Sequence, residues 1–225
     1  MTRRLLVGGW VAVCALALVT GGAFAQEKKG DEKKTPPKAG EVTDKAKDAA
    51  KDAKAGGPSH EEMMAVMQEA AKLAKEHETL KALAGSWKTQ TKCWMDPSAP
   101  PEVSSGTYNA ELILGGRWLV GNHVGTMGDQ PFEGHGMWGY DTQKKKYVNI
   151  WADNWGTAAM ISEGTADPTG KILTFKGTYD CPMEKRPVTC RMVTTIKSPN
   201  EFVFEMYQTG VDGKETKGLE VTYTK

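Results

Sequence analysis

Short segments in which apolar and polar residues alternate follow one another from Trp87 to Lys225, with no helix-length stretch between them. Alternation with a period of two predicts β-strands, and the breaks hold turn-forming residues such as Asp167-Pro168-Thr169-Gly170 and Asp212-Gly213. Consecutive antiparallel strands must pair or cover their edges, so the predicted fold is a closed up-and-down β-barrel, hollow or filled by side chains. About ten strands are expected, over residues 86–95, 104–114, 116–127, 132–140, 146–153, 157–166, 171–179, 187–197, 200–208 and 214–224.

The first 25 residues have the pattern of a secretory signal peptide. Arg3 and Arg4 precede the apolar stretch Leu5–Thr20, and Ala23-Phe24-Ala25 is a typical cleavage site. The alternative is an uncleaved membrane anchor, but the apolar stretch is short for a bilayer span. The sequence therefore predicts export to the periplasm or the medium, without stable membrane insertion after cleavage.

Residues 26–58 form a segment rich in Lys, Asp and Ala that contains no aromatic residue. Such a segment buries too little apolar surface to order itself, so we expect a disordered spacer. Its part Thr43–Ala55 has good helix formers and opposite charges at helical spacing. A partner-binding helix is the alternative for this part.

A helix is predicted within residues 59–85. Ser59 and Glu62 fit a capping box, and Gly85 stands where a helix would end. The helix is expected over Glu61–Ala84, either continuous or broken near Glu76, with its apolar side covering the barrel of residues 86–225. That side is a stripe at helical spacing, made of Met63, Met67, Ala70, Ala74 and His77.

Charge and cysteine content limit the classes of function. The formal net charge is +1, which gives no electrostatic reason to expect a nucleic-acid partner. Cys93, Cys181 and Cys190 follow the cleavage site, and no pair has the spacing of a zinc site. Because the last two flank a predicted strand connection, we expect a Cys181–Cys190 disulfide, with three reduced thiols as the alternative.

Several motifs together resemble a known family. They begin with H-x-x-L-x-x-L-x-G-x-W at 77–87 and L-G-G-R-W-L at 114–119, and continue with P-F-E-G-x-G at 131–136, G-Y-D at 139–141 and W-x-D at 151–153. Over roughly residues 77–224 the chain is similar to the exported bacterial family called domain of unknown function 1579. This resemblance implies a lipocalin-like, or calycin-type, barrel, and it implies no reaction.

Gly134, Gly136 and Gly139 match the dinucleotide-binding pattern G-x-G-x-x-G. That fingerprint requires a helix that starts at the glycines, whereas here a turn and another strand are expected. Glycines inside strands more often mark curvature or the close approach of a neighbour. We therefore interpret these three residues as structural.

A hypothetical register places His123, His135 and Asp153 in one row. If the third and fourth strands form a hairpin centred on Asp129, and the next hairpin is centred near Lys144, the polar residues share one face. Two imidazoles and a carboxylate could bind a transition metal, through His123 and His135, or act as an acid–base set. The alternatives are a polar ligand pocket and a solvated outer surface.

The predicted function is the binding of a small apolar or amphipathic ligand inside the barrel. Trp87, Trp118, Trp138 and Trp151 are expected to form the wall, with Arg117 and Asp153 as polar ligand contacts. The alternatives are an enzyme that uses the His/His/Asp row and an envelope protein that acts through its Met-rich helix. No catalytic motif is recognisable, and the sequence identifies no cofactor.

Overall fold

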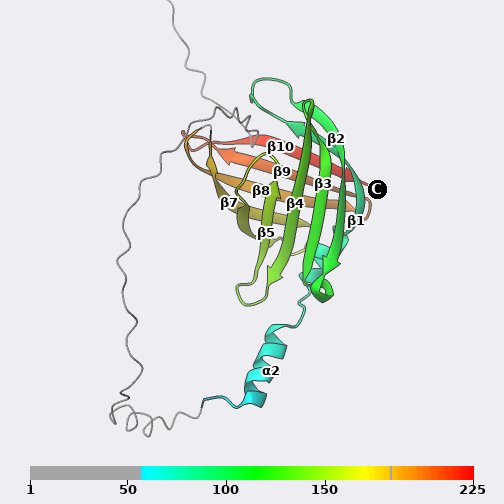
Figure 1. The fold of residues 1–225 in the computed structure, drawn as a ribbon, viewed down its shortest axis with the longest axis vertical. Coiled ribbons are helices and arrows are strands. Elements are labelled where there is room, and N and C mark those ends of the chain that lie inside the picture. The colour runs from blue at the N-terminus through cyan, green and yellow to red at the C-terminus, as the bar shows by residue number, and fades with distance from the viewer. Residues whose placement is uncertain (1–56, 183) are drawn as a thin grey trace, which may run out of the picture. The chain divides into compact units, whose positions relative to one another are not determined.

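The structure is a computed structural model that describes residues 57–182 and 184–225 (Figure 1). Residues 72–225 belong to one compact unit, and the helix α2 (His60–Ala70) belongs to a second unit. The predicted signal peptide and nearly all of the predicted spacer lie outside the described residues. No helix of the described part is long and apolar enough to cross a membrane.

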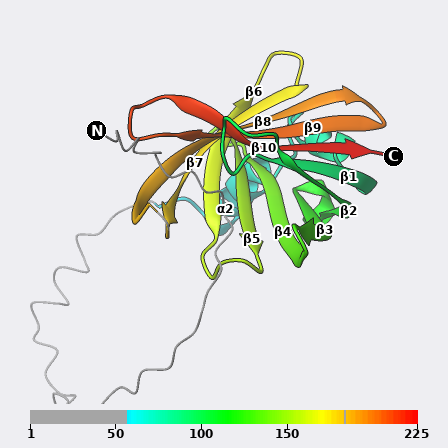
Figure 2. The ribbon, with the colours of Figure 1, turned by 90° about the horizontal axis from the view of Figure 1, so that it is seen from above.

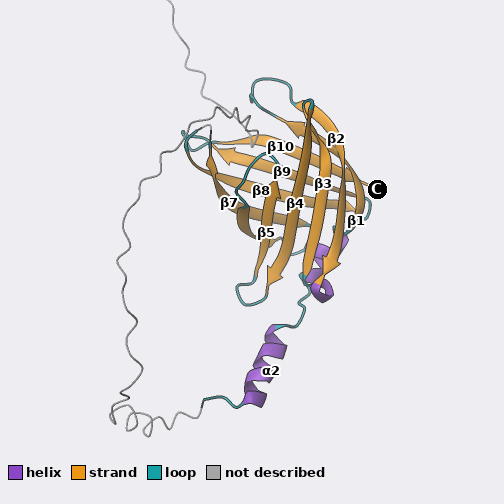
Figure 3. Cartoon of the chain, in the orientation of Figure 1, coloured by secondary structure: helices purple, strands orange, loops and turns teal. Residues whose placement is uncertain are grey.

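Ten antiparallel strands of the described residues form a closed barrel (Figures 2 and 3). Each strand pairs with the next along the chain, and β1 pairs with β10, so the predicted up-and-down barrel is confirmed. The predicted strand ends agree with the observed ones to within three residues. The strands are β1 (Gly85–Cys93), β2 (Glu102–Ile113), β3 (Trp118–Met127), β4 (Gln130–Asp141), β5 (Lys146–Asp153), β6 (Met160–Ala166), β7 (Ile172–Cys181), β8 (Arg186–Ser198), β9 (Glu201–Thr209) and β10 (Glu215–Thr224).

The helix α3 (His77–Ala82) lies across the end of the barrel at which β1 begins. Tyr147 Oη donates a hydrogen bond to the Glu76 carbonyl over 3.0 Å, and Thr79 Oγ1 donates to the Gly170 carbonyl over 3.3 Å. Leu80 is fully buried, and it joins the barrel residues in one apolar cluster. The helix therefore closes this end, which we call the closed end. The opposite end, where β1 and β5 finish, is called the open end.

The predicted helical segment holds two short helices, α2 and α3, with non-helical residues between them. The Ser59–Glu62 capping box is present at the start of α2. α2 buries none of its own residues, and Met63 and Met67 are 46% and 64% exposed. The two halves of the predicted helical segment therefore differ, because α3 buries His77 and Leu80.

The hypothetical register of the β3–β4 hairpin is wrong by one residue. Gly128 adopts a positive φ of 56°, and Met127 pairs directly with Gln130, so the turn has two residues. A one-residue shift changes every facing pair. His123 therefore faces Gly134, whereas His135 faces Asn122.

The β4–β5 hairpin is also shifted by one residue from the hypothetical register. Asp141 pairs with Lys146, and the Asp141 carboxylate accepts hydrogen bonds from the backbone N–H groups of Gln143 and Lys144. Asp153 consequently faces Gly134 instead of His135. The predicted row of two histidines and one aspartate does not form.

The predicted Cys181–Cys190 disulfide is also wrong. Cys181 pairs with Arg186, whereas Cys190 pairs with Gly177, four residues earlier on β7. Four residues of a strand span about 13 Å, roughly twice the Cα separation that a disulfide allows. Both cysteines are buried free thiols, and burial raises the pKa of Cys190 to about 12. A thiol with such a pKa is chemically inert at neutral pH.

Candidate functional site

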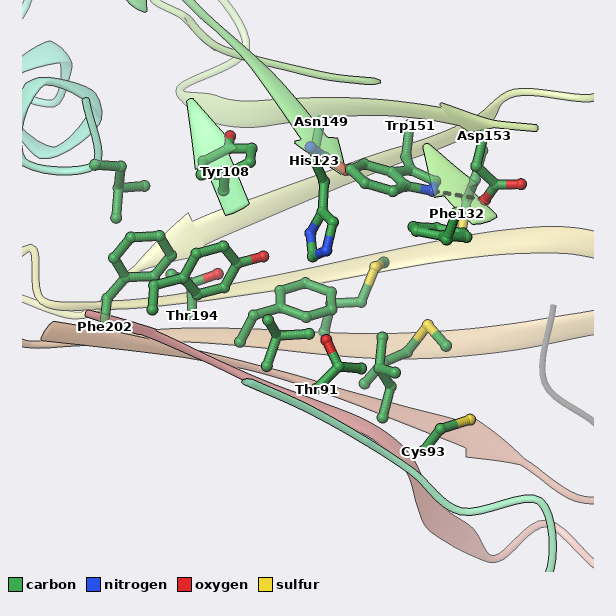
Figure 4. A pocket seen from close by; sticks show the side chains of 18 of the residues that line it. Thr91, Cys93, Tyr108, His123, Phe132, Asn149, Trp151, Asp153, Thr194 and Phe202 are labelled. Atoms are coloured by element: carbon green, nitrogen blue, oxygen red, sulfur yellow. Dashed lines mark hydrogen bonds between the residues drawn. The ribbon is translucent and has the colours of Figure 1, made fainter. Parts of the chain in front are cut away.

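A cavity of about 140 Å³ lies inside the barrel (Figure 4). It has space for about ten water molecules, or some 300 Å³ of liquid, which is the lower limit of ordinary ligand pockets. Leu83 lies near its closed end, and Asp153 lies at its open end. Aromatic and sulfur-containing side chains dominate the lining: Tyr108, Phe132, Trp138, Trp151, Phe202, Phe204, Tyr223, Cys93, Met127, Met160, Met192 and Met206.

Glycines on β3 and β4 let aromatic rings lie against the barrel wall. A Cβ atom on Gly121 would lie 2.0 Å from Tyr108 Oη, and one on Gly134 would lie 2.3 Å from Trp151 Cζ2. The rings therefore occupy the space that side chains at these two positions would fill. The G-x-G-x-x-G pattern of Gly134, Gly136 and Gly139 lies within β4, and no helix begins there. These three glycines therefore have the structural role expected from the sequence.

Uncharged polar groups are buried in the lining. His123, Asn149 and Thr194 are 7%, 6% and 1% exposed. The Thr194 hydroxyl has no hydrogen-bond partner among the described residues. Burial lowers the pKa of His123, so its imidazole is neutral at pH 7 and offers one donor and one acceptor. A ligand that reaches these groups could hydrogen-bond with them.

Asp153 and two aromatic rings form the rim of the cavity at the open end. Trp151 Nε1 donates a 2.9 Å hydrogen bond to Asp153 Oδ2, and the backbone N–H of Trp155 donates a 3.0 Å bond to Oδ1. The rings of Phe132 and Trp151 are nearly parallel, with an interplanar angle of 17° and centroids 6.4 Å apart. The carboxylate is therefore held in a fixed orientation beside an aromatic surface.

The structure separates the predicted ligand-binding residues into two groups. Trp138, Trp151 and Asp153 line the cavity. Trp87 packs against Phe202 in the apolar cluster, where its Nε1 donates to the Leu83 carbonyl over 3.1 Å, and it is not among the cavity-lining residues. Arg117 is exposed, and its Nη1 donates to the Leu114 carbonyl. Trp118, which was also expected in the wall, lies on the outer face of β3 and is not among the cavity-lining residues.

The predicted metal-binding pair is divided between the two faces of the sheet. His123 lines the cavity, whereas His135 is on the outer face, 60% exposed and 3.4 Å from Glu133. The described residues contain no group of three or more His, Cys, Asp or Glu side chains that could hold a metal ion. The enzyme hypothesis based on a His123, His135 and Asp153 row therefore loses its structural basis.

We predict a pH-dependent stability that His123 controls. The unfolded chain binds a proton on this imidazole near pH 6.5, whereas the folded protein binds it only at lower pH. The free energy of unfolding should therefore decrease as the pH falls below about 6.5, by at most about 1.4 kcal/mol per pH unit from this group. Urea denaturation at pH 7.5 and 5.5 would measure the effect. His123→Gln should reduce this dependence; an unchanged dependence in a folded His123→Gln variant would contradict the assignment.

The described residues thus form a closed ten-stranded antiparallel barrel with an internal cavity, an architecture that resembles lipocalin-like barrels. The chain belongs to the family described as "Protein of unknown function (DUF1579)", whose family model matches residues 72–225. No curated protein matches the chain at a significant level of sequence similarity.

Solved structures support the fold. The Rv2717c protein from M. tuberculosis is 16% identical, with a TM-score of 0.52; the match covers 68% of this chain and 99% of that one. The S-type phycobiliprotein lyase CPES from Guillardia theta is 11% identical, with a TM-score of 0.50; the match covers 70% of this chain and 96% of that one. At these identities the likeness shows a shared barrel fold alone.

Proposed function

We propose that this protein binds one small apolar or amphipathic molecule inside the barrel. The observation that carries the proposal is the cavity itself, which is lined mainly by aromatic and sulfur-containing side chains and includes the buried polar groups of His123, Asn149 and Thr194. An aromatic wall with a few polar groups is the usual composition of a small-molecule site. A buried hydroxyl without a partner costs about 1–3 kcal/mol, and a ligand or a bound water could remove that cost.

The two ends of the barrel differ, and this difference suggests the orientation of the ligand in the cavity. Leu83 and the core beside it fill the closed end, so an apolar part of the ligand would lie there. Asp153 and Trp151 at the open end would face its polar part. The signal-peptide pattern of residues 1–25 supports the further proposal that binding takes place outside the cytoplasm.

Nile red, an uncharged apolar dye, provides the test. We expect it to bind with micromolar affinity and to quench the fluorescence of Trp138 and Trp151, which line the cavity. Thr194→Phe should weaken this binding at least about tenfold, because the larger ring projects into the cavity. Fluorescence titration would measure both affinities.

Thr195→Phe is the matched control, because Thr195 is the next residue of β8 and its side chain points to the opposite face of the sheet. Its dye affinity should remain within about twofold of the unmodified protein. Absence of dye binding by the unmodified protein, or equal losses in both folded variants, would contradict an internal binding site.

A further inference from the structure

The charged side chains that line the cavity and the hollow beside its open end are acidic. Asp153 is the only carboxylate among the described residues that line the cavity, and that lining includes no lysine or arginine. A second hollow shares Thr91, Cys93 and Met127 with the cavity, and Glu102 and Asp129 add two further carboxylates there. A ligand that enters at this end therefore meets negative charge and no basic side chain of the lining.

The aromatic surface beside Asp153 favours a cation as well. The face of an aromatic ring attracts positive charge, and tryptophan is the most effective of the aromatic side chains. Trp151 lies against Gly134 with one face, so its other face is turned toward the interior of the barrel (Figure 4). The hydrogen bond from its Nε1 to Asp153 holds this ring and the carboxylate side by side.

Each oxygen of Asp153 still has capacity to accept a further interaction. Oδ2 accepts one hydrogen bond from Trp151, and Oδ1 accepts one from the backbone of Trp155. A carboxylate has about four acceptor sites in total. A cationic group could therefore approach Asp153 without breaking either hydrogen bond.

We propose that the polar end of the ligand carries a positive charge, and that this cation sits at the open end against Trp151 and Asp153. The ligand class would be a cationic amphiphile, with an amine or quaternary ammonium group and an apolar chain that extends toward Leu83. This inference rests on the proposed binding function and specifies its ligand. An anionic amphiphile is disfavoured, because its head group would meet the carboxylates with no basic partner in the lining.

The charge of the whole protein does not select between these ligands. The formal net charge is +1, so the overall electrostatic attraction for a cation is negligible. Two basic residues of the hairpins at this end have acidic partners, since Arg186 is paired with Glu184 and Lys214 lies 4.0 Å from Asp212. A preference for cations would therefore arise from the rim itself.

Three probes with the same decyl chain would test the proposal on the unmodified protein: decyltrimethylammonium, decyl maltoside and decyl sulfate. Each would displace Nile red below its micelle concentration. We expect the cationic probe to bind about tenfold more tightly than the anionic probe, with the uncharged probe between them. Equal affinities, or tighter binding of decyl sulfate, would overturn the proposal. Failure of all three probes to displace the dye would instead contradict the proposed function.

Asp153→Asn supplies an independent arm of the test, because asparagine keeps a carbonyl that can accept the Trp151 hydrogen bond. Affinity for decyltrimethylammonium should fall about fivefold to tenfold, and affinity for decyl maltoside should stay within about twofold. Glu133→Gln is the control, because Glu133 is a half-exposed carboxylate that pairs with His135 on the outer face. Equal losses in both variants would overturn a role for Asp153. The comparison of probes on the unmodified protein does not depend on either variant folding.

Discussion

Replacing Gly164 with alanine is expected to lower the free energy of unfolding by about 3 kcal/mol, the largest stability effect that we predict for a single methyl group. A Cβ atom at this position of β6 would lie 2.3 Å from the Thr174 carbonyl oxygen and 2.8 Å from the Phe175 ring. The carbonyl belongs to the backbone of β7, the neighbouring strand, so relief of the clash requires the two strands to move apart. Urea denaturation followed by tryptophan fluorescence would measure the loss.

Gly218→Ala is the matched control for this prediction. Gly218 also lies in a strand, but a Cβ atom there would find its nearest neighbour, Gln208 Cδ, at an ordinary 3.7 Å. Its free energy of unfolding should change by less than about 1 kcal/mol, because alanine also restricts the unfolded chain. If Gly164→Ala proved as stable as the control, the close β6–β7 approach at this position would be wrong.

The strands and the barrel closure could be predicted because their signals are local. Alternation and turn residues mark each strand, and consecutive antiparallel strands with no covering helices leave closure as the simplest way to remove both edges. The register could not be obtained from the same pattern, because apolar residues occupy both faces of β3 and β4. Trp118 and Val120 lie on the outer face, whereas Trp138 and Phe132 line the cavity. The sequence did contain one usable signal, since Gly128-Asp129 is a favoured two-residue hairpin turn.

The candidate site was predicted only in part, for a related reason. Trp151 and Asp153 line the cavity, and the sequence prediction included Trp151 as part of the wall and Asp153 as a polar ligand contact. Trp87 looked equivalent in sequence, but α3 packs over the closed end and buries it in the apolar cluster. Thr194 carries no distinguishing sequence signal. Its importance comes from an unpartnered hydroxyl, which only the packing around it reveals.

Gly134→Ala is expected to weaken Nile red binding at least about tenfold and to lower the free energy of unfolding by about 2 kcal/mol. The added Cβ would lie 2.3 Å from Cζ2 and 2.6 Å from Cη2 of Trp151, so this ring must leave the barrel wall. The Trp151 ring would move toward the cavity. There it would occupy the space of the ligand, and its hydrogen bond to Asp153 would be lost. Fluorescence titration gives the affinity, and near-ultraviolet circular dichroism reports the changed environment of the tryptophan.

Gly136→Ala separates this mechanism from a general intolerance of the strand to alanine. Gly136 lies two residues further along β4 on the same face and beneath the same ring, but its Cβ would lie 3.3 Å from Trp151 Cε3 and 3.3 Å from Trp138 Nε1. Shifts of a few tenths of an ångström relieve such contacts, so dye affinity should stay within about threefold. A double variant, Gly134→Ala with Trp151→Leu, should recover part of the lost stability, because the smaller side chain removes the clash. If Gly136→Ala impaired binding as strongly as Gly134→Ala, or if the double variant recovered nothing, the position of Trp151 against the barrel wall would not be what keeps the cavity open.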